Sequence, residues 1–140
     1  MASKKATAKK LGFDSPFEMD LANSVLRNAE YHPDKIEYTM PETHHTYTTD
    51  FRLGPYFIEV KGFLRREDKK KYVAIANNIE QRGYKLIFVM KNPEKKMAGS
   101  RKRKDGTYLS HKEWLEKNGV MCYNPDELEQ LLKFEGLIDG

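Results

Sequence analysis

Two carboxylates and an amine lie close together in the segment from His45 to Gly62, HTYTTDFRLGPYFIEVKG. Eight residues separate Asp50 from Glu59, and a single residue separates Glu59 from Lys61. Two neighbouring carboxylates repel each other unless a cation lies between them. A hard divalent cation such as Mg²⁺ prefers oxygen ligands, and a nearby lysine can orient a water molecule or balance the charge of a phosphate. The pattern therefore predicts a metal site.

The spacing alone also occurs by chance in highly charged chains, and charged residues make up 33% of this one. A solvated surface is the alternative that the surrounding elements must exclude. Two strands are expected here on either side of Gly54-Pro55, over residues 47–53 and 56–61. Alternate side chains of a strand point to the same face, so Glu59 and Lys61 should project together. Pairing of the two strands should then bring Asp50 beside Glu59.

A helix should precede this hairpin. Ser15 can cap it, Pro16 suits its first turn, and Glu18 lies at the capping-box position. We expect this helix to continue to residue 28 or 29. From the local sequence, Glu18 is interpreted as a capping residue.

The hairpin should lead into a βαβ unit. A helix is expected over residues 67–82, because apolar residues recur there at helical spacing. These are Tyr72, Ile75, Ala76 and Ile79. Residues 84–90 (YKLIFVM) form an apolar run typical of a strand buried on both faces, which should lie parallel to the preceding strand. The expected fold class is α/β, as a small mixed β-sheet flanked by helices.

Shorter signals predict the remaining elements. A capping box at Ser110 predicts one further helix. Asn124-Pro125-Asp126-Glu127 predicts the start of the last helix, with acids well placed for the helix dipole. Short strands are expected at 35–40 and 120–123. We expect residues 1–12 (rich in lysine) to form a disordered basic arm and residues 13–140 to form a single domain.

Composition narrows the class of partner. Lys and Arg number 25 against 21 for Asp and Glu, a net charge of +4, which suits a nucleic-acid partner. The single cysteine, Cys122, excludes an internal disulfide and a cysteine-based zinc site, and fits a reducing cytoplasm. No apolar run is long enough to span a bilayer, and the basic amino terminus lacks the apolar segment of a signal peptide.

Basic residues gather in two places. Residues 91–106 break the apolar pattern and should form a loop, with no acid between Lys95 and Lys104. Such clusters contact phosphates and so read backbone shape and not sequence, although a charge run can also be merely solvated. The candidate DNA-binding residues are Lys69, Lys70, Arg101, Lys102, Arg103 and Lys104.

Paired histidines at 44 and 45 suggest a metal finger or an HNH nuclease. That interpretation requires a later asparagine and histidine in a strand–strand–helix unit, and they are not in place. Structural or phosphate-contacting roles are favoured.

The assembled pattern resembles the PD-(D/E)xK nuclease superfamily and, more closely, the phage endonuclease I family of Holliday-junction resolvases. The resemblance covers residues 15–123. It is carried by HTYTTDF (45–51), IEVKG (58–62), the basic stretch at 66–71, Tyr108-Leu109-Ser110 and EKNG (116–119). Thr49 stands where the superfamily usually has proline before the motif aspartate.

The resemblance implies a role for each site residue. Asp50 and Glu59 would be metal ligands, Lys61 the catalytic lysine, and Glu18 the acid supplied by the first helix. Val60 would join the metal-binding set. The family also implies a homodimer exchanging a segment at about 36–44, so that Glu18 from one chain would meet Asp50, Glu59 and Lys61 of the other.

We therefore expect an Mg²⁺-dependent endonuclease, with Mn²⁺ as a substitute, that cuts branched DNA at four-way junctions. No organic cofactor and no membrane association are expected, and the location would be the cytoplasm, that of the host if the gene belongs to a phage. Two alternatives stay open. One is a nuclease of the same superfamily acting on linear or mismatched duplex, and the other is a catalytically silent DNA-binding module.

Overall fold

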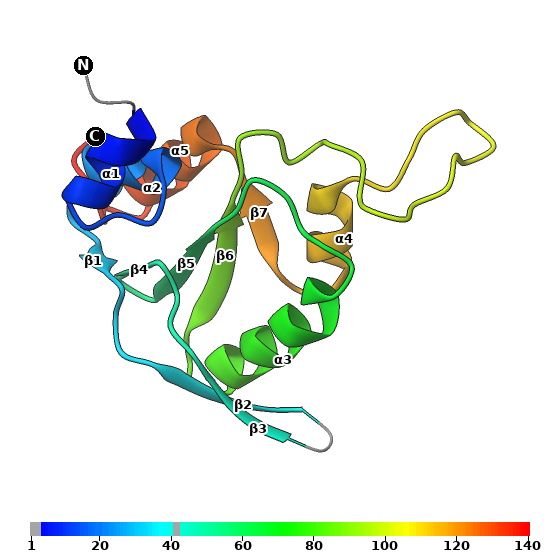
Figure 1. The fold of residues 1–140 in the computed structure, drawn as a ribbon, viewed down its shortest axis with the longest axis horizontal. Coiled ribbons are helices and arrows are strands. Elements are labelled where there is room, and N and C mark those ends of the chain that lie inside the picture. The colour runs from blue at the N-terminus through cyan, green and yellow to red at the C-terminus, as the bar shows by residue number, and fades with distance from the viewer. Residues whose placement is uncertain (1–3, 41–42) are drawn as a thin grey trace.

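The computed structural model describes residues 4–40 and 43–140 as a mixed α/β fold (Figure 1). The helices are α1 (Lys4–Lys10), α2 (Pro16–Ala22), α3 (Asp68–Gln81), α4 (His111–Lys117) and α5 (Pro125–Phe134). The strands are β1 (Glu30–Tyr31), β2 (Ile36–Met40), β3 (Thr43–Tyr47), β4 (Phe51–Leu53), β5 (Tyr56–Val60), β6 (Lys85–Val89) and β7 (Met121–Tyr123). The expected fold class is confirmed.

A five-stranded sheet in the order β1-β4-β5-β6-β7 forms the centre of the molecule. Strands β4 and β5 are antiparallel and meet at a turn, where Gly54 has a positive φ of 56°. Strands β5 and β6 are parallel and joined through α3, as the predicted βαβ unit requires. Because β6 and β7 are also parallel, the carboxyl ends of β5, β6 and β7 lie along the same edge of the sheet.

Two apolar cores pack on opposite faces of this sheet. Leu86 and Phe88 of β6 pack among residues of α3 and α4, on the face that the β2-β3 hairpin also covers. Ile87 and Val89 pack against residues of α2 and α5 on the other face (Figure 1). The continuous apolar sequence of β6 therefore reflects burial on both faces. The buried stripe predicted for α3 is confirmed, with Tyr72, Ile75, Ala76 and Ile79 all buried.

Side-chain caps begin three of the helices. The Ser15 hydroxyl accepts a hydrogen bond from the Glu18 amide at the start of α2. Full capping boxes occur at Ser110 for α4 and at Asn124 for α5. These local signals were readable in the sequence because a cap depends only on residues three positions apart.

Two expectations about the amino-terminal region differ from the structure. Residues 4–10 form the helix α1 where a disordered arm was expected, with Ala8 buried and α1 lying against α2. Helix α2 ends at Ala22, several residues early. There the Ser24 hydroxyl donates to the Asp20 carbonyl oxygen, which offers the backbone an alternative to continuing the helix. Residues 1–3 of the expected arm lie outside the described residues.

The first strand of the predicted hairpin is interrupted. Tyr47 belongs to β3, which pairs with β2 in a separate two-stranded sheet, and pairing with β5 begins only at Phe51. The chain thus changes sheets over residues 48–50. Thr49 is fully buried in this crossing segment, which leaves Asp50 just outside the ladder.

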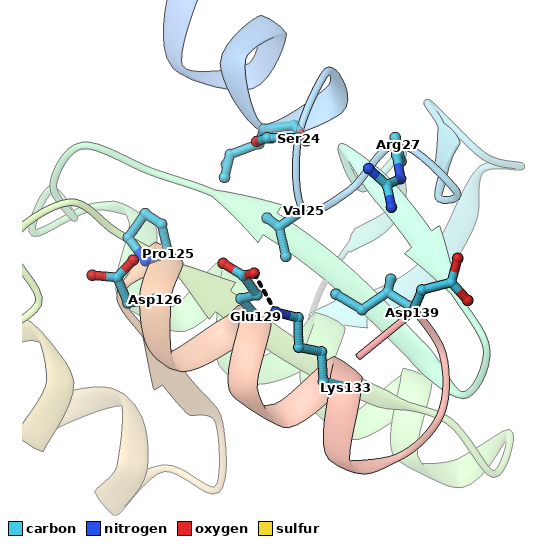
Figure 2. A pocket seen from close by; sticks show the side chains of 10 residues that line it. Ser24, Val25, Arg27, Pro125, Asp126, Glu129, Lys133 and Asp139 are labelled. Carbon is cyan, nitrogen blue, oxygen red and sulfur yellow. Dashed lines mark hydrogen bonds and ion pairs between the residues drawn. The ribbon is translucent and has the colours of Figure 1, made fainter.

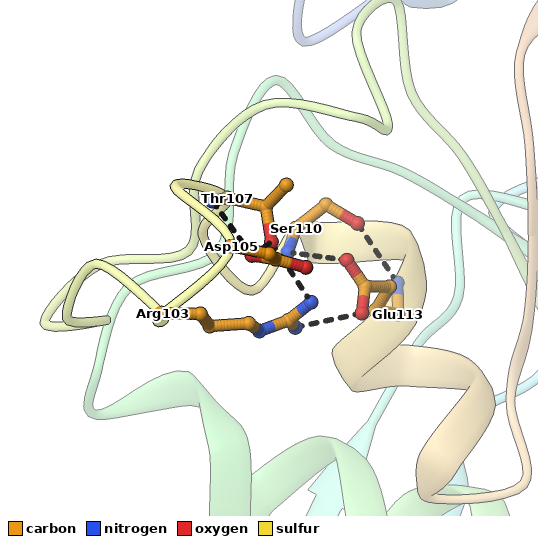
Figure 3. Close-up of polar contacts among 5 residues, drawn as sticks. All are labelled: Arg103, Asp105, Thr107, Ser110 and Glu113. Carbon is orange, nitrogen blue, oxygen red and sulfur yellow. Dashed lines mark hydrogen bonds and ion pairs between the residues drawn. The ribbon is translucent and has the colours of Figure 1, made fainter.

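The basic loop between β6 and α4 projects from the body of the molecule (Figure 1). Its base is held by a bridge between Lys96 and Ser110 and by the buried side chain of Met97. Near its tip, Arg103 reaches back to the Glu113 carboxylate at 2.7 Å (Figure 3). Within the described ranges, no helix combines the length and the apolar character needed to cross a bilayer.

Candidate metal centre and active site

A polar pocket of about 360 Å³ lies where β4 begins and β5 ends. It is lined by Asp14, Glu18, His32, Tyr47, Thr48, Asp50, Glu59, Val60 and Lys61. The five residues that the sequence assigned to metal binding and catalysis all line this pocket. This structure contains one chain, and that chain supplies all five.

Backbone amides from the two neighbouring segments hold Asp50 in place. Its carboxylate Oδ2 accepts a hydrogen bond from the Val60 amide at 2.8 Å, across the end of β5. Its carbonyl oxygen accepts one from the His32 amide, also at 2.8 Å. These bonds hold Asp50 beside Glu18 and Glu59, whose pKa values it raises.

Glu59 is buried on the α3 side of the sheet, at 2% exposure. Ile58 and Val60 pack on the opposite face, as the alternation of the strand predicts. Burial raises the pKa of Glu59 well above its usual value, and hydrogen bonding to Asp50 raises it further. The Tyr47 hydroxyl donates to Glu59 Oε2 and, with the charge of Lys61, opposes that rise.

Glu18 faces Asp50 from the first turn of α2 and is 5% exposed. Burial, together with the neighbouring Asp50 carboxyl, raises the pKa of Glu18 from 4.5 to about 8. Its Oε2 accepts a hydrogen bond from the Ser15 hydroxyl at 3.0 Å. Its buried Oε1 has no hydrogen-bond partner among the described residues. Glu18 therefore belongs to the cap of α2 and to the pocket at once, where the local sequence indicated only the cap.

Lys61 follows β5 and lies on the α3 side with Glu59. Its amide continues the parallel pairing by donating to the Val89 carbonyl oxygen at 3.1 Å. Its ammonium lies 5.5 Å from the centre of the Tyr72 ring, a cation–π distance. The hydroxyls of Tyr72 and Tyr47 are 3.3 Å apart, so the lysine and the Glu59 carboxylate share one aromatic wall.

The donor set fits a divalent cation. Ligand atoms of Asp14, Glu18, His32 and Asp50 lie within 4.8 Å of one another. The unpaired Glu18 Oε1 and the raised pKa values of Glu18 and Glu59 both indicate a site whose negative charge is not balanced by protein groups. Glu59 is not in that group of four, although Asp50 raises its pKa, and Val60 contacts Asp50 through its amide.

The sequence reasoning missed four pocket residues: Asp14, His32, Tyr47 and Thr48. Asp14 directly precedes the cap of α2, and His32 follows β1 with a positive φ of 49°. Tyr47 was assigned only to a strand. Their contribution depends on contacts between distant segments, and no local spacing marks it. Of the paired histidines, His45 stacks on Tyr38 in the β2-β3 sheet and is not among the residues that line the pocket. The side chain of His44 lies outside what the structure describes.

The candidate DNA-binding residues do not line the pocket, and they differ in how they are held. Arg103 forms the ion pair with Glu113, so its guanidinium is engaged within the protein (Figure 3). The ammonium of Lys69 lies 5.7 Å from the centre of the Trp114 ring. The other four are exposed: Lys70, Arg101, Lys102 and Lys104.

A second cavity, of about 390 Å³, lies between the α2-β1 connection and α5 (Figure 2). It is slightly larger than the acidic pocket but is lined by a mixture of apolar and charged side chains. The Lys133 ammonium and the Glu129 carboxylate pair across one turn of α5 at 2.8 Å. Among the described residues, the acids and histidine whose ligand atoms lie close enough to share one ion are found in the acidic pocket, so we assign the chemistry there.

The fold and the pocket define an α/β protein with a buried acidic centre suited to a divalent cation. The family model for phage endonuclease I matches residues 1–128, and the chain belongs to that family. It is 32% identical to Endodeoxyribonuclease 1 of Enterobacteria phage T3 over 93 residues, which are 66% of this chain and 56% of that protein. It is 27% identical to Endonuclease I of Escherichia phage T7 over 118 residues, 84% of this chain and 73% of that protein.

The matched region thus covers just over half the length of the phage T3 relative. No solved structure matches the chain. The mixed sheet with helices on both faces is what the structure itself establishes, and the restriction-endonuclease-like core stays a prediction.

Proposed function

We propose that this protein is a metal-dependent DNA endonuclease that hydrolyses phosphodiester bonds in branched DNA and resolves four-way junctions. The observation that carries the proposal is the buried cluster of Glu18, Asp50 and Glu59 beside Lys61, with one carboxylate oxygen left unpaired. Membership of the phage endonuclease I family supports the nuclease activity. The names of the T3 and T7 relatives support DNA as the substrate.

Each pocket residue has a role that its contacts suggest. Asp50, Glu59 and Glu18 would hold the cation, with Val60 completing the set. A bound Mg²⁺ or Mn²⁺ supplies a water of lowered pKa and stabilises charge on the scissile phosphate. Lys61 would orient that water or offset negative charge in the transition state. The Tyr47 hydroxyl favours the ionised form of Glu59, the form that can ligate.

Junction specificity would come from shape and from pairing of protomers. A four-way junction offers no fixed sequence, so the exposed basic residues on the loop and on α3 would contact phosphates. A homodimer would present two pockets to a two-fold substrate. Because one chain already brings Glu18 beside Asp50, exchange of the region around residues 36–44 would rebuild the same contacts between two chains.

The test is cleavage of a labelled four-way junction beside its matched linear duplex, with Mg²⁺ and with chelator. Metal-dependent symmetric cleavage of the junction alone is expected. Equal cleavage of both substrates would keep the nuclease and remove the junction specificity. Tight junction binding without cleavage would identify the catalytically silent module instead.

A further inference from the structure

Asp14 and His32 form a polar pair at the mouth of the acidic pocket, outside the motif that runs from Asp50 to Lys61. His32 Nε2 lies 3.1 Å from Asp14 Oδ2. The two residues come from different segments, since Asp14 precedes α2 and His32 follows β1. Both line the pocket with Glu18 and Asp50. The pair therefore belongs to the same cavity as the carboxylates while bringing a different kind of ligand atom.

The His32 ring is held in one orientation. It stacks on Tyr31 with 4.0 Å between ring centres, and its amide donates to the Asp50 carbonyl oxygen. Its positive φ of 49° turns the chain back toward Asp50. A non-glycine residue in this region of φ is uncommon and persists where the surroundings determine it.

The spacing of the donor atoms suits a coordination shell. Those of Asp14, Glu18, His32 and Asp50 lie within 4.8 Å of one another. Octahedral ligands at about 2.1 Å from a small divalent cation are about 3 to 4.2 Å apart. The bound of 4.8 Å exceeds the larger of these separations by about 0.6 Å, so the donors would move closer together to share one ion.

An independent observation points to a ligand at this position. Glu18 is 95% buried, and its Oε1 has no hydrogen-bond partner in the part of the chain described. Buried carboxylate oxygens are almost always paired. The charged groups that perturb Glu18 are the Asp50 and Asp14 carboxyls, which have the same sign, so a cation is the partner that would relieve them.

We propose that Asp14 and His32, with Glu18 and Asp50, form a cation position of mixed nitrogen and oxygen ligands that takes a first-row transition metal such as Mn²⁺. Mg²⁺ favours oxygen ligands, whereas imidazole suits transition metals. His32 thereby tunes which divalent cation the acidic pocket retains. This inference rests on the proposed metal-dependent function.

The experiment uses electron paramagnetic resonance of Mn²⁺ added to the full-length protein. Loss of the free-ion signal measures binding, and electron spin-echo modulation detects nitrogen bonded to the bound ion. We expect ¹⁴N modulation in the wild-type protein and its replacement by a ¹⁵N pattern when only histidine is ¹⁵N-labelled. The labelled wild-type protein needs no substitution, so misfolding cannot confuse the result.

Assignment to His32 uses His32→Asn, because asparagine also tolerates a positive φ. His45→Gln is the matched control, since His45 lies outside the pocket. His32→Asn should abolish the histidine nitrogen signal and weaken Mn²⁺ binding about tenfold. The affinity for Mg²⁺, measured by displacement of Mn²⁺, should change by less than about twofold. His45→Gln should change neither.

The outcomes separate the inference from the proposed function. Saturable Mn²⁺ binding without histidine nitrogen modulation, or modulation that survives in His32→Asn, overturns the role of His32 and leaves the metal-dependent nuclease standing. Failure of the wild-type protein to bind Mn²⁺ at all overturns both.

Discussion

At the scale of single residues, the pocket is a set of carboxyl groups that the fold holds close together. Glu18 and Glu59 are buried beside Asp50, and the pKa of each is raised. Metal binding at such a centre must displace protons. Burial of these carboxylates lowers the stability of the metal-free protein. A bound cation would offset this cost, because it neutralises the charge of the carboxylates.

The pH dependence of stability in Glu18→Gln tests the stability cost of burying this carboxyl group. The pKa of Glu18 is about 8 in the folded protein and near 4.5 when unfolded, so between these values the folded state holds a proton that the unfolded chain has released. The free energy of unfolding should fall as pH rises through this window. Glutamine removes the ionisable group, so Glu18→Gln should be more stable than wild type at pH 8, on the order of 2 kcal/mol, and similar at pH 4.5. Urea unfolding in the presence of chelator at both pH values measures the difference in unfolding free energy between the variant and wild type. The same difference at pH 4.5 and at pH 8 would contradict the prediction.

Tyr47→Phe tests the bond to Glu59. The Tyr47 hydroxyl lowers the pKa of Glu59, so its loss should raise that pKa further and move the rise of cleavage to higher pH. Activity should be reduced more at pH 6.5 than at pH 8.5. The matched control is Tyr56→Phe, which loses a similar hydrogen bond to Glu135 outside the pocket. Both variants should lose about 1–3 kcal/mol of stability, and a pH profile unchanged in Tyr47→Phe would exclude this role.

At the scale of elements, α2 and the end of β5 position the ligands. Helix α2 is short, and its cap at Ser15 holds Glu18 through both the amide and the carboxylate. At the end of β5, the Val60 amide holds Asp50. The ladder supplies Glu59 and Lys61 on one face, and the crossing segment before β4 supplies Asp50.

Loss of the α2 cap should weaken metal binding, whereas loss of the α5 cap should not. Ser15→Ala and Asn124→Ala should each cost about 1 kcal/mol of stability. Only Ser15→Ala should weaken Mn²⁺ binding, because Asn124 caps a helix away from the acidic pocket. Thermal unfolding and metal titration of the two variants provide the comparison. Equal metal affinity in both would mean that the Ser15 hydroxyl does not position Glu18.

The sequence predicted the elements that depend on local signals. The caps at Ser15, Ser110 and Asn124, the stripe of α3 and the apolar run of β6 each lie within a few residues, and each is found in the structure. The break between Tyr47 and Phe51 was not predictable in this way. It depends on β3 pairing with β2, so propensity within the segment carries no sign of it.

At the scale of the whole molecule, the acidic pocket joins parts of the chain that are far apart in sequence. The juxtaposition of Asp50, Glu59 and Lys61 was predictable because a tight hairpin fixes their register. Glu18 entered only through the family resemblance. Asp14 and His32 had no local pattern, since they reach the pocket through the packing of α2 and β1 on β4.

Mixing inactive variants tests the proposed exchange between protomers. If each pocket takes Glu18 from one chain and Lys61 from the other, a heterodimer of Glu18→Ala and Lys61→Ala has one doubly defective pocket and one intact pocket. Refolding the two variants together should then restore single-strand nicking of a junction. If each chain completes its own pocket, both stay defective and no activity returns. Variants refolded separately and then mixed at low temperature provide the control.

The most direct test of the central claim is junction cleavage and junction binding measured on Glu59→Gln. Glutamine keeps the size of the side chain and its place on β5 but removes the buried carboxylate that lies beside Asp50 and Lys61. We predict that Mg²⁺-dependent cleavage falls by at least about a hundredfold, while the affinity for a four-way junction in chelator stays within a few-fold of wild type. Cleavage that persists in Glu59→Gln at the wild-type rate would contradict the assignment of this pocket as the catalytic centre.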